Sequence, residues 1–262
     1  MDKKKLNRIK SKVLWTVLMA TIAILFVKSV QRKIDASIEK VVVVVKPIEG
    51  DNDLISAKDV GKFFKRYLGY SIEDANISDL NLRELEDLLN QDERVKISQM
   101  FIDGQDRLNV WIIQRQPVVR IMDGSRTSYY LDEDGNKLDI AGKTPIRVPI
   151  ATGHIELYQE ELIKSDKESR LREVLEIAKH IQKDKILAPL IEQIDVDSNN
   201  EIVLIPKIGR HELTLGDAQN LEEKFTNLKV MYKDGLPREG WRKFSVLKLN
   251  YKGMIVAKKK IK

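Results

Sequence analysis

One uncharged stretch near the start divides the chain, Val13-Leu14-Trp15-Thr16-Val17-Leu18-Met19-Ala20-Thr21-Ile22-Ala23-Ile24-Leu25-Phe26-Val27, with Lys12 and Lys28 at its two ends. Fifteen residues of helix would cover about 22 Å, whereas a bilayer core is about 30 Å thick and is usually crossed by about 20 residues. The two lysines can lengthen the helix, because their stems can lie along lipid while their ammonium groups reach the headgroups. The stretch therefore predicts a transmembrane helix over residues 13–30.

Two other interpretations of the stretch are weaker. A cleaved signal peptide needs small residues at a cleavage site, and the following Lys28-Ser29-Val30-Gln31-Arg32-Lys33 offers none. A buried helix of a soluble protein would show a polar face. We therefore expect an uncleaved anchor whose lipid-facing side chains include Val13, Leu14, Trp15, Val17, Leu18, Ile22, Ile24, Leu25, Phe26 and Val27.

The net charge of +6 is concentrated at the two ends of the chain. Residues 1–40 carry a net charge of +7, the last five residues add four lysines, and the body between them has a net charge of −5. A nucleic-acid-binding domain would carry its positive charge on the folded body, so we expect no nucleic-acid partner. Six cations before the apolar stretch and four after it favour a cytoplasmic N-terminus, with the body on the far side of the membrane.

The chain lacks the residue patterns of catalytic and metal sites. It contains no cysteine, and His154, His180 and His211 lie in separate predicted elements. The acidic segments that begin at Asp132 and Asp195 lack the later ligands of a calcium loop. No nucleophile elbow and no glycine-rich phosphate loop are present in the sequence. We expect a protein without catalytic residues, metal or cofactor.

Residues 40–116 predict the order strand, helix, helix, strand, strand. Five consecutive valines, Val41 to Val45, indicate a first strand that is buried on both faces. Ser56 with Asp59 forms a variant capping box at the start of a helix, and Gly69 is a plausible stop. A leucine-rich helix follows Asp79, and two strands with a period of two then flank the turn Asp103-Gly104.

Residues 117–257 predict a different arrangement, in which short strands alternate with turns and one long helix spans residues 166–186. Further strands are expected at residues 191–196, 201–206 and 211–215, and a helix is expected around Phe225. The chain closes with strands over residues 246–251 and 254–257. The whole pattern predicts an α+β fold behind a single transmembrane helix.

Five short strings follow one another along the body: Gln114-Arg115-Gln116-Pro117-Val118-Val119, Tyr129-Tyr130-Leu131-Asp132-Glu133-Asp134-Gly135, Val148-Pro149-Ile150-Ala151-Thr152-Gly153, Leu213-Thr214-Leu215-Gly216 and Leu247-Lys248-Leu249-Asn250-Tyr251-Lys252-Gly253. In this order, behind a basic tail and one anchor, they resemble the bacterial FtsQ/DivIB cell-division proteins. Gln114 stands where that family usually has Glu, Lys248 where it has Asp, and Asn250 where it has Arg. The basic finish and the segment 237–241 resemble its Bacteroidetes branch.

The resemblance implies a domain organisation and a location. Residues 1–12 would be a cytoplasmic basic tail, residues 40–116 a POTRA domain (β-α-α-β-β), and residues 117–257 a mixed α/β "β-domain" that ends in an edge strand before a basic tail at 258–262. The body would be periplasmic, on the inner membrane at the division septum. The protein would be a non-enzymatic scaffold that binds FtsB-like and FtsL-like division proteins.

The resemblance also implies that the last strand binds the partner, and an exposed strand edge has unpaired N–H and C=O groups that a partner strand can use. The expected contact residues are Trp241, Phe244, Lys248, Leu249, Asn250, Tyr251, Lys252, Met254, Ile255 and Val256. Two alternatives stay open. The lysines near this strand can instead guard the edge, and Trp241 and Phe244 can be core residues rather than aromatic anchors.

Two other functions compete with the scaffold. A POTRA-bearing factor for protein export or outer-membrane assembly would need a membrane barrel, and the strands after Pro117 are too few and too charged for one. An anchored cell-wall enzyme would need a nucleophile, a base or metal ligands in a recognisable arrangement. The sequence favours the scaffold.

Overall fold

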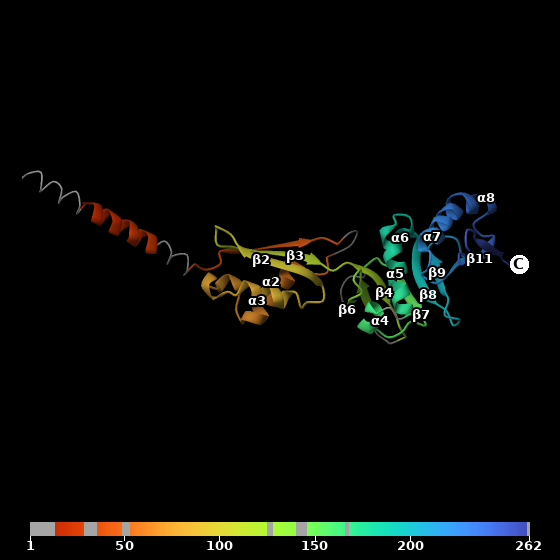
Figure 1. The fold of residues 1–262 in the computed structure, drawn as a ribbon, viewed down its shortest axis with the longest axis horizontal. Helices are drawn as coiled ribbons and strands as arrows, with labels where there is room; N and C mark the ends of the chain where they lie inside the picture. The colour runs from red at the N-terminus through yellow and green to blue at the C-terminus, as the bar shows by residue number, and fades with distance from the viewer. Residues whose placement is uncertain are drawn as a thin grey trace, which may run out of the picture. The chain divides into compact units, whose positions relative to one another are not determined.

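The protein forms two compact units in the computed structural model, which describes residues 14–28, 36–48, 53–124, 128–139, 146–165 and 168–260. The first unit consists of Met1–Lys46 and Ile55–Ile113, and the second of Pro47–Leu54 and Gln114–Lys262. Figure 1 shows both units, with helices packed against strands in each. The predicted α+β class is confirmed.

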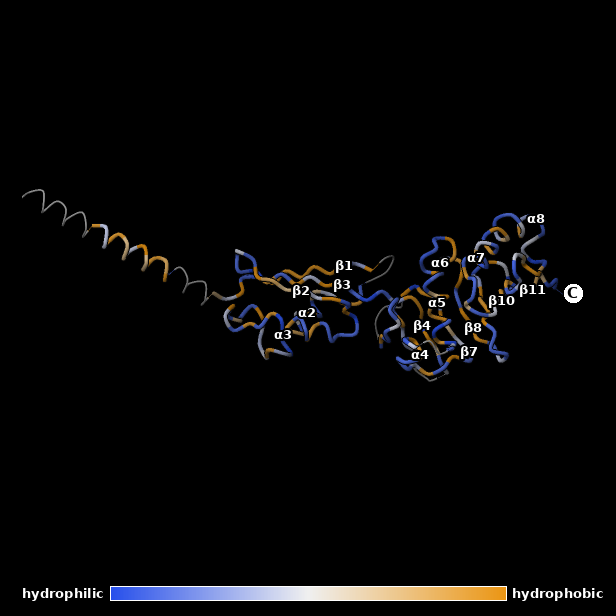
Figure 2. Tube along the Cα trace, viewed as in Figure 1, coloured by the Kyte–Doolittle hydropathy of each residue, from blue (hydrophilic) through white to orange (hydrophobic). Residues whose placement is uncertain are grey.

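Residues 14–28 form a helix whose side chains are all exposed, and Figure 2 shows most of its length as hydrophobic. The Thr21 hydroxyl donates to the carbonyl oxygens of Val17 and Leu18 within the helix, at 3.1 and 2.8 Å. No helix among the described residues has both the length and the hydropathy that crossing a membrane requires. The predicted segment also includes Val13 and residues 29–30, which lie outside the described residues, as does the tail over 1–12.

After the helix over 14–28, the described residues of the first unit form a three-stranded sheet and two α-helices, in the predicted chain order. Its elements are β1 (Lys40–Lys46), α2 (Ala57–Leu68), the 3-10 turns η1 (Ile72–Asp74) and η2 (Ile77–Asp79), α3 (Leu82–Leu89), β2 (Val95–Ile102) and β3 (Arg107–Gln114). The strand order is β1-β3-β2, and β1 runs parallel to β3. This arrangement leaves β1 and β2 at the two edges.

The ends of helix α2 follow from local sequence. Ser56 accepts a hydrogen bond from the Asp59 N–H at 3.3 Å, and the Asp59 carboxylate accepts one from the Ser56 N–H at 3.0 Å. This reciprocal pair confirms the predicted capping box. Gly69 ends the helix with φ of +82°, in the left-handed region that a side chain would disfavour. Val60 and Phe64 are fully buried on the face of the helix that packs against the core.

The prediction that the valine strand is buried on both faces is wrong. Only Val41, Val43 and Val45 pack against the core, whereas Val44 remains 47% exposed. The reason is that the buried cluster of this unit lies on one face of the sheet only. The same asymmetry appears in β2, where Ser98 and Met100 are buried while Ile97 and Phe101 are exposed.

The described residues of the second unit form a nine-stranded sheet with the order β12-β11-β10-β9-β8-β7-β4-β5-β6. The strands are β4 (Pro117–Ile121), β5 (Tyr129–Asp132), β6 (Lys137–Leu138), β7 (Ile150–Gly153), β8 (Ile191–Val196), β9 (Ile202–Pro206), β10 (Glu212–Gly216), β11 (Phe244–Lys248) and β12 (Val256–Lys259). The helices are α4 (Glu160–Lys164), α5 (Arg170–Lys183), α6 (Leu187–Leu190), α7 (Leu221–Val230) and α8 (Leu236–Glu239), with a π-turn, η3 (Met231–Gly235), between the last two.

The helix predicted over residues 166–186 is observed as α5. It begins at Arg170 and ends at Lys183, three residues before the predicted end. The Ser169 side chain caps it by accepting from the Arg172 N–H at 3.4 Å. Its apolar stripe is buried against the sheet and consists of Leu171, Val174, Leu175, Ile177, Ala178 and Ile181. This single helix therefore supplies much of the core of the second unit.

The amide of Gln114, at the end of β3, makes two hydrogen bonds to the segment before helix α2. Its buried side chain accepts a hydrogen bond from the Leu54 N–H at 2.6 Å and donates one to the Asp53 carboxylate at 2.8 Å. A glutamate could accept the first bond but could not donate the second. An amide at position 114 thus matches the presence of Asp53 in this chain.

The acidic string after β5 forms a turn. Asp132 is buried and accepts from the N–H groups of Asp134 and Asn136 at 2.9 and 2.7 Å, and it forms an ion pair with Arg115 at 2.9 Å. Gly135 has a φ of +82°, and a side chain there would collide with Ile163. The predicted turn is confirmed.

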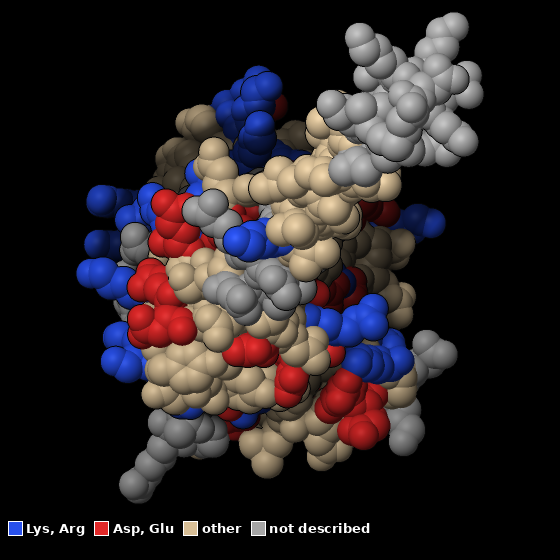
Figure 3. Space-filling view, turned by 90° about the vertical axis from the view of Figure 1, so that its left-hand side faces the viewer, with Lys and Arg blue, Asp and Glu red and all other residues tan. Residues whose placement is uncertain are grey.

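Charged side chains of both signs mix on the face that Figure 3 presents. Lys and Arg lie beside Asp and Glu, with uncharged surface between them. This face carries no uniform patch of either sign.

Candidate partner-binding edge

The last strand lies at one end of the nine-stranded sheet. β12 pairs antiparallel with β11, with Lys248 opposite Val256 and Leu247 opposite Ala257. Among the described residues no strand pairs with the other side of β12. An edge of this kind presents N–H and C=O groups to any extended segment that approaches it. The edge strand is observed at residues 256–259, two residues later than the predicted 254–257.

Burial divides the predicted contact residues into three groups. Phe244 and Leu249 are buried in the core of the second unit, at 6% and 2% exposure. Three residues are half-buried, Trp241, Lys248 and Ile255. Five are exposed, Asn250, Tyr251, Lys252, Met254 and Val256. The alternative that Phe244 is a core residue is therefore correct.

Trp241 connects the core with the surface. Its ring packs edge-on against Tyr232, with ring centroids 5.6 Å apart and planes at 78°. The Tyr232 hydroxyl lies 2.8 Å from the Nε2 atom of buried His211. The core alternative thus holds in part for Trp241, because its ring packs against the core while the residue keeps partial exposure. Its role as an aromatic anchor for a partner stays a prediction.

Two backbone N–H groups of the segment between β11 and β12 donate hydrogen bonds to other parts of the second unit. The Leu249 N–H donates to the Thr214 carbonyl at 2.8 Å, and the Gly253 N–H donates to the Glu223 carboxylate at 2.8 Å. Tyr251 lies in the turn and not in the strand, contrary to the predicted span 246–251. β11 ends at Lys248, which pairs with Val256 of β12, so Tyr251 lies in the connection between the two strands.

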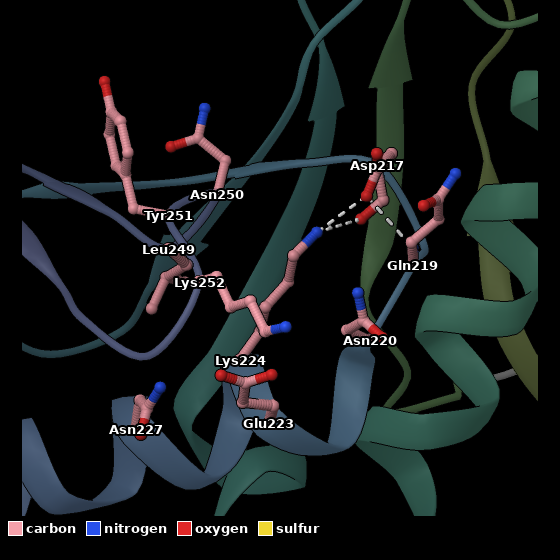
Figure 4. Close-up of a pocket in the computed structure, with 10 residues that line it drawn as sticks. All are labelled: Asp217, Gln219, Asn220, Glu223, Lys224, Asn227, Leu249, Asn250, Tyr251 and Lys252. Carbon is pink, nitrogen blue, oxygen red and sulfur yellow. Dashed lines mark hydrogen bonds and ion pairs between the residues drawn. The ribbon is translucent and has the colours of Figure 1, made fainter.

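A polar hollow lies between this turn and helix α7 (Figure 4). It encloses about 280 Å³ and is lined by Asp217, Gln219, Asn220, Glu223, Lys224, Asn227, Leu249, Asn250, Tyr251 and Lys252. The Lys224 ammonium donates to the Leu215 carbonyl at 3.0 Å and to the Asp217 carboxylate at 2.7 Å. Partial burial opposes ionisation of Asp217, yet the bonds from Lys224 and from the Gln219 N–H lower its pKa. This ion pair fixes the wall of the hollow.

A second hollow of about 460 Å³ lies beside the first and has a more apolar lining. Its residues are Asn227, Val230, Met231, Asp234, Gly235, Arg238, Glu239, Gly253, Met254 and Ile255. Val230 and Met254 are 56% and 59% exposed. Val256, the first residue of β12, follows Ile255 in the chain. We call Val230, Met231, Met254, Ile255 and Val256 the apolar strip. Val230 and Met231 were not among the contact residues expected from the sequence. The signal that could have identified them is that both are apolar and lie outside the apolar stripe of α7, which consists of Leu221, Phe225 and Leu228.

Lysines surround the edge. Lys258, Lys259 and Lys260 are all exposed at the end of the chain that the structure describes. Lys243 forms an ion pair with Glu239, and the hydrogen bond from this ammonium lowers the pKa of Glu239. Positive charge on an edge discourages pairing between two copies of the same edge and leaves it open to an acidic segment.

A family model described as FtsQ/DivIB, C-terminal related, covers residues 116–258, from the residue before β4 into β12. No curated protein matches the chain. The matched region contains the whole nine-stranded sheet apart from the last residue of β12 and is more than half of the sequence. The chain belongs to the FtsQ/DivIB family of cell-division proteins.

Proposed function

We propose that this protein is a non-enzymatic, membrane-anchored scaffold of the bacterial division machinery. In this role it recruits FtsB-like and FtsL-like partners at the septum and links early with late division proteins. The observation that carries the proposal is the exposed edge strand β12, which lies within the family region and has no strand on its outer side among the described residues.

The proposed mode of binding is addition of a partner strand to β12. Main-chain hydrogen bonds would supply affinity, and side-chain contacts would supply specificity. The apolar strip beside the edge offers a place for apolar side chains of the same partner. The lysines at 258–260 favour a partner segment that carries Asp or Glu.

The proposed location is the inner membrane, with the N-terminus in the cytoplasm and the body in the periplasm. Support comes from the uncharged stretch 13–27 and from the exposed apolar side chains of the helix over 14–28. The first unit would be a POTRA domain, which its order of strand, helix, helix, strand, strand supports. The competing function in protein export would require no partner at β12.

A pair of single substitutions tests the proposed edge. Val256→Glu places a charge on the apolar strip and on β12, whereas Ile208→Glu makes the same change at another exposed apolar residue of the second unit. Binding of the full chain to the FtsB-like and FtsL-like proteins of its host would be measured by titration in detergent. We expect Val256→Glu to weaken binding by at least about tenfold, or about 1.4 kcal/mol, and Ile208→Glu to leave it unchanged.

The possible outcomes test the assignment of the β12 edge and the scaffold function separately. Equal binding by both variants and the parent would remove the edge assignment while keeping the scaffold. Absence of binding by the parent, with folded partners, would contradict the scaffold itself and favour the export alternative.

A further inference from the structure

The three-stranded sheet of the first unit has one face that the core does not cover. Five large apolar side chains on it are exposed: Trp111 at 54%, Phe101 at 48%, Ile97 at 47%, Val44 at 47% and Ile113 at 41%. Val44 lies directly opposite Trp111 in the register of β1 and β3. We call these five residues the open face. Large apolar patches of this kind on a soluble surface mark a contact with another molecule or a membrane.

The charged residues at the strand positions of the open face are basic, whereas Glu39, Asp103 and Asp106 lie beside Lys40 and Arg107 at one end of the sheet. Lys40 and Lys46 stand on the same side of β1 as Val44, since residues two apart on a strand share a face, and both are exposed. Arg107 lies opposite Lys40 and pairs with Asp103 in the turn after β2, at 2.8 Å. The strand positions of this face carry no Asp or Glu.

The combination of aromatic and aliphatic side chains with basic residues is the composition of surfaces that lie in a lipid interface. Anionic headgroups complement the lysines. A second copy of this face would instead bring lysines of like charge together. Charge therefore selects an anionic bilayer over a dimer.

The chain length places the face within reach of a membrane. Lys28 ends the apolar helix and Lys40 begins β1, and the chain between them spans at most about 40 Å when fully extended. We propose that the open face of the first unit rests on the surface of an anionic lipid bilayer. This inference rests on the proposed anchor and adds a second, peripheral membrane contact.

The absence of cysteine from the sequence allows a site-specific test. Gln99→Cys places a label between Ile97 and Phe101 on the exposed side of β2, and Lys62→Cys places one on the exposed side of helix α2 as a control. The full chain, labelled with an environment-sensitive fluorophore, would be reconstituted into vesicles of phosphatidylcholine and phosphatidylglycerol that contain brominated lipid. We expect quenching several-fold greater at position 99 than at position 62.

A charge-reversal pair provides a second measurement. Lys40→Glu with Lys46→Glu should abolish most of the quenching at position 99, whereas Lys62→Glu with Lys65→Glu, which makes the same charge change on α2, should preserve it. Circular dichroism would confirm that both variants are folded.

Three results would overturn the inference, and they are distinguishable. Equal quenching at both positions in protein that floats with the vesicles would reject the lipid contact and keep the anchor. Energy transfer between labelled copies that increases with protein density, without quenching, would assign the face to a second copy. Failure of the protein to float with the vesicles would reject the anchor and this contact together.

Discussion

At the scale of single residues, His211 makes the stability of the second unit depend on pH. Burial, and then the charge of Lys260, lower the pKa of His211 below its usual value of 6.5. Its Nδ1 atom is buried and has no partner among the described residues. The unfolded chain therefore binds a proton at a pH at which the folded protein does not.

The expected result is a loss of stability on acidification. The free energy of unfolding should fall as the pH drops below about 6.5, until the folded-state pKa of His211 is passed. His211→Gln cannot bind this proton, so its unfolding free energy should depend less steeply on pH between about 6.5 and 5. Denaturant titrations over that range measure both slopes, and equal slopes would refute the assignment.

Gln114 provides a second prediction at this scale. Gln114→Glu loses the hydrogen bond to Asp53 and brings two carboxylates together, so the unfolding free energy should fall by about 1–3 kcal/mol at neutral pH. Asp53→Asn in the same chain restores a donor and should recover part of that loss. A double-mutant cycle measures the coupling, and additive effects would contradict the pairing of these side chains.

At the scale of elements, the sequence predicts those features that depend on neighbouring residues in the chain better than those that depend on contacts between distant elements. The limits of helix α2 were predictable because Ser56, Asp59 and Gly69 act on their own neighbours. The exposure of Val44 was not, because it depends on which face of the sheet the helices cover. β12 was placed two residues early because its lysines carry no apolar signal, and pairing with β11 determines where it lies.

The cap of helix α2 can be tested directly. Ser56→Ala removes the acceptor for the Asp59 N–H and should lower the unfolding free energy of the first unit by about 1 kcal/mol. Hydrogen exchange should be faster at the first turn of α2 than in the parent, while β8 and β9 of the second unit keep their protection. Unchanged exchange at α2 would mean that the cap contributes nothing to stability.

At the scale of the whole molecule, the sequence predicted the family better than the site. Five strings in order identified the FtsQ/DivIB resemblance, and the family match over residues 116–258 confirms it. Among the predicted contact residues, Phe244 and Leu249 belong to the core, since alternation along a short strand does not tell which side the core occupies. The first unit lies entirely outside the family match, so its assignment as a POTRA domain remains a prediction.

The central claim is that a partner strand pairs with β12, and hydrogen exchange of the full chain with and without its FtsB-like and FtsL-like partners tests it most directly. Partner binding should slow exchange at those amides of residues 256–259 that point away from β11, because an added strand would bond the open side of β12. The Lys260 N–H already donates to the Lys243 carbonyl, and β6 lies at the opposite edge of the same sheet, so both should be unaffected. Protection at β6 or elsewhere, with no change at 256–259 in a formed complex, would contradict the claim.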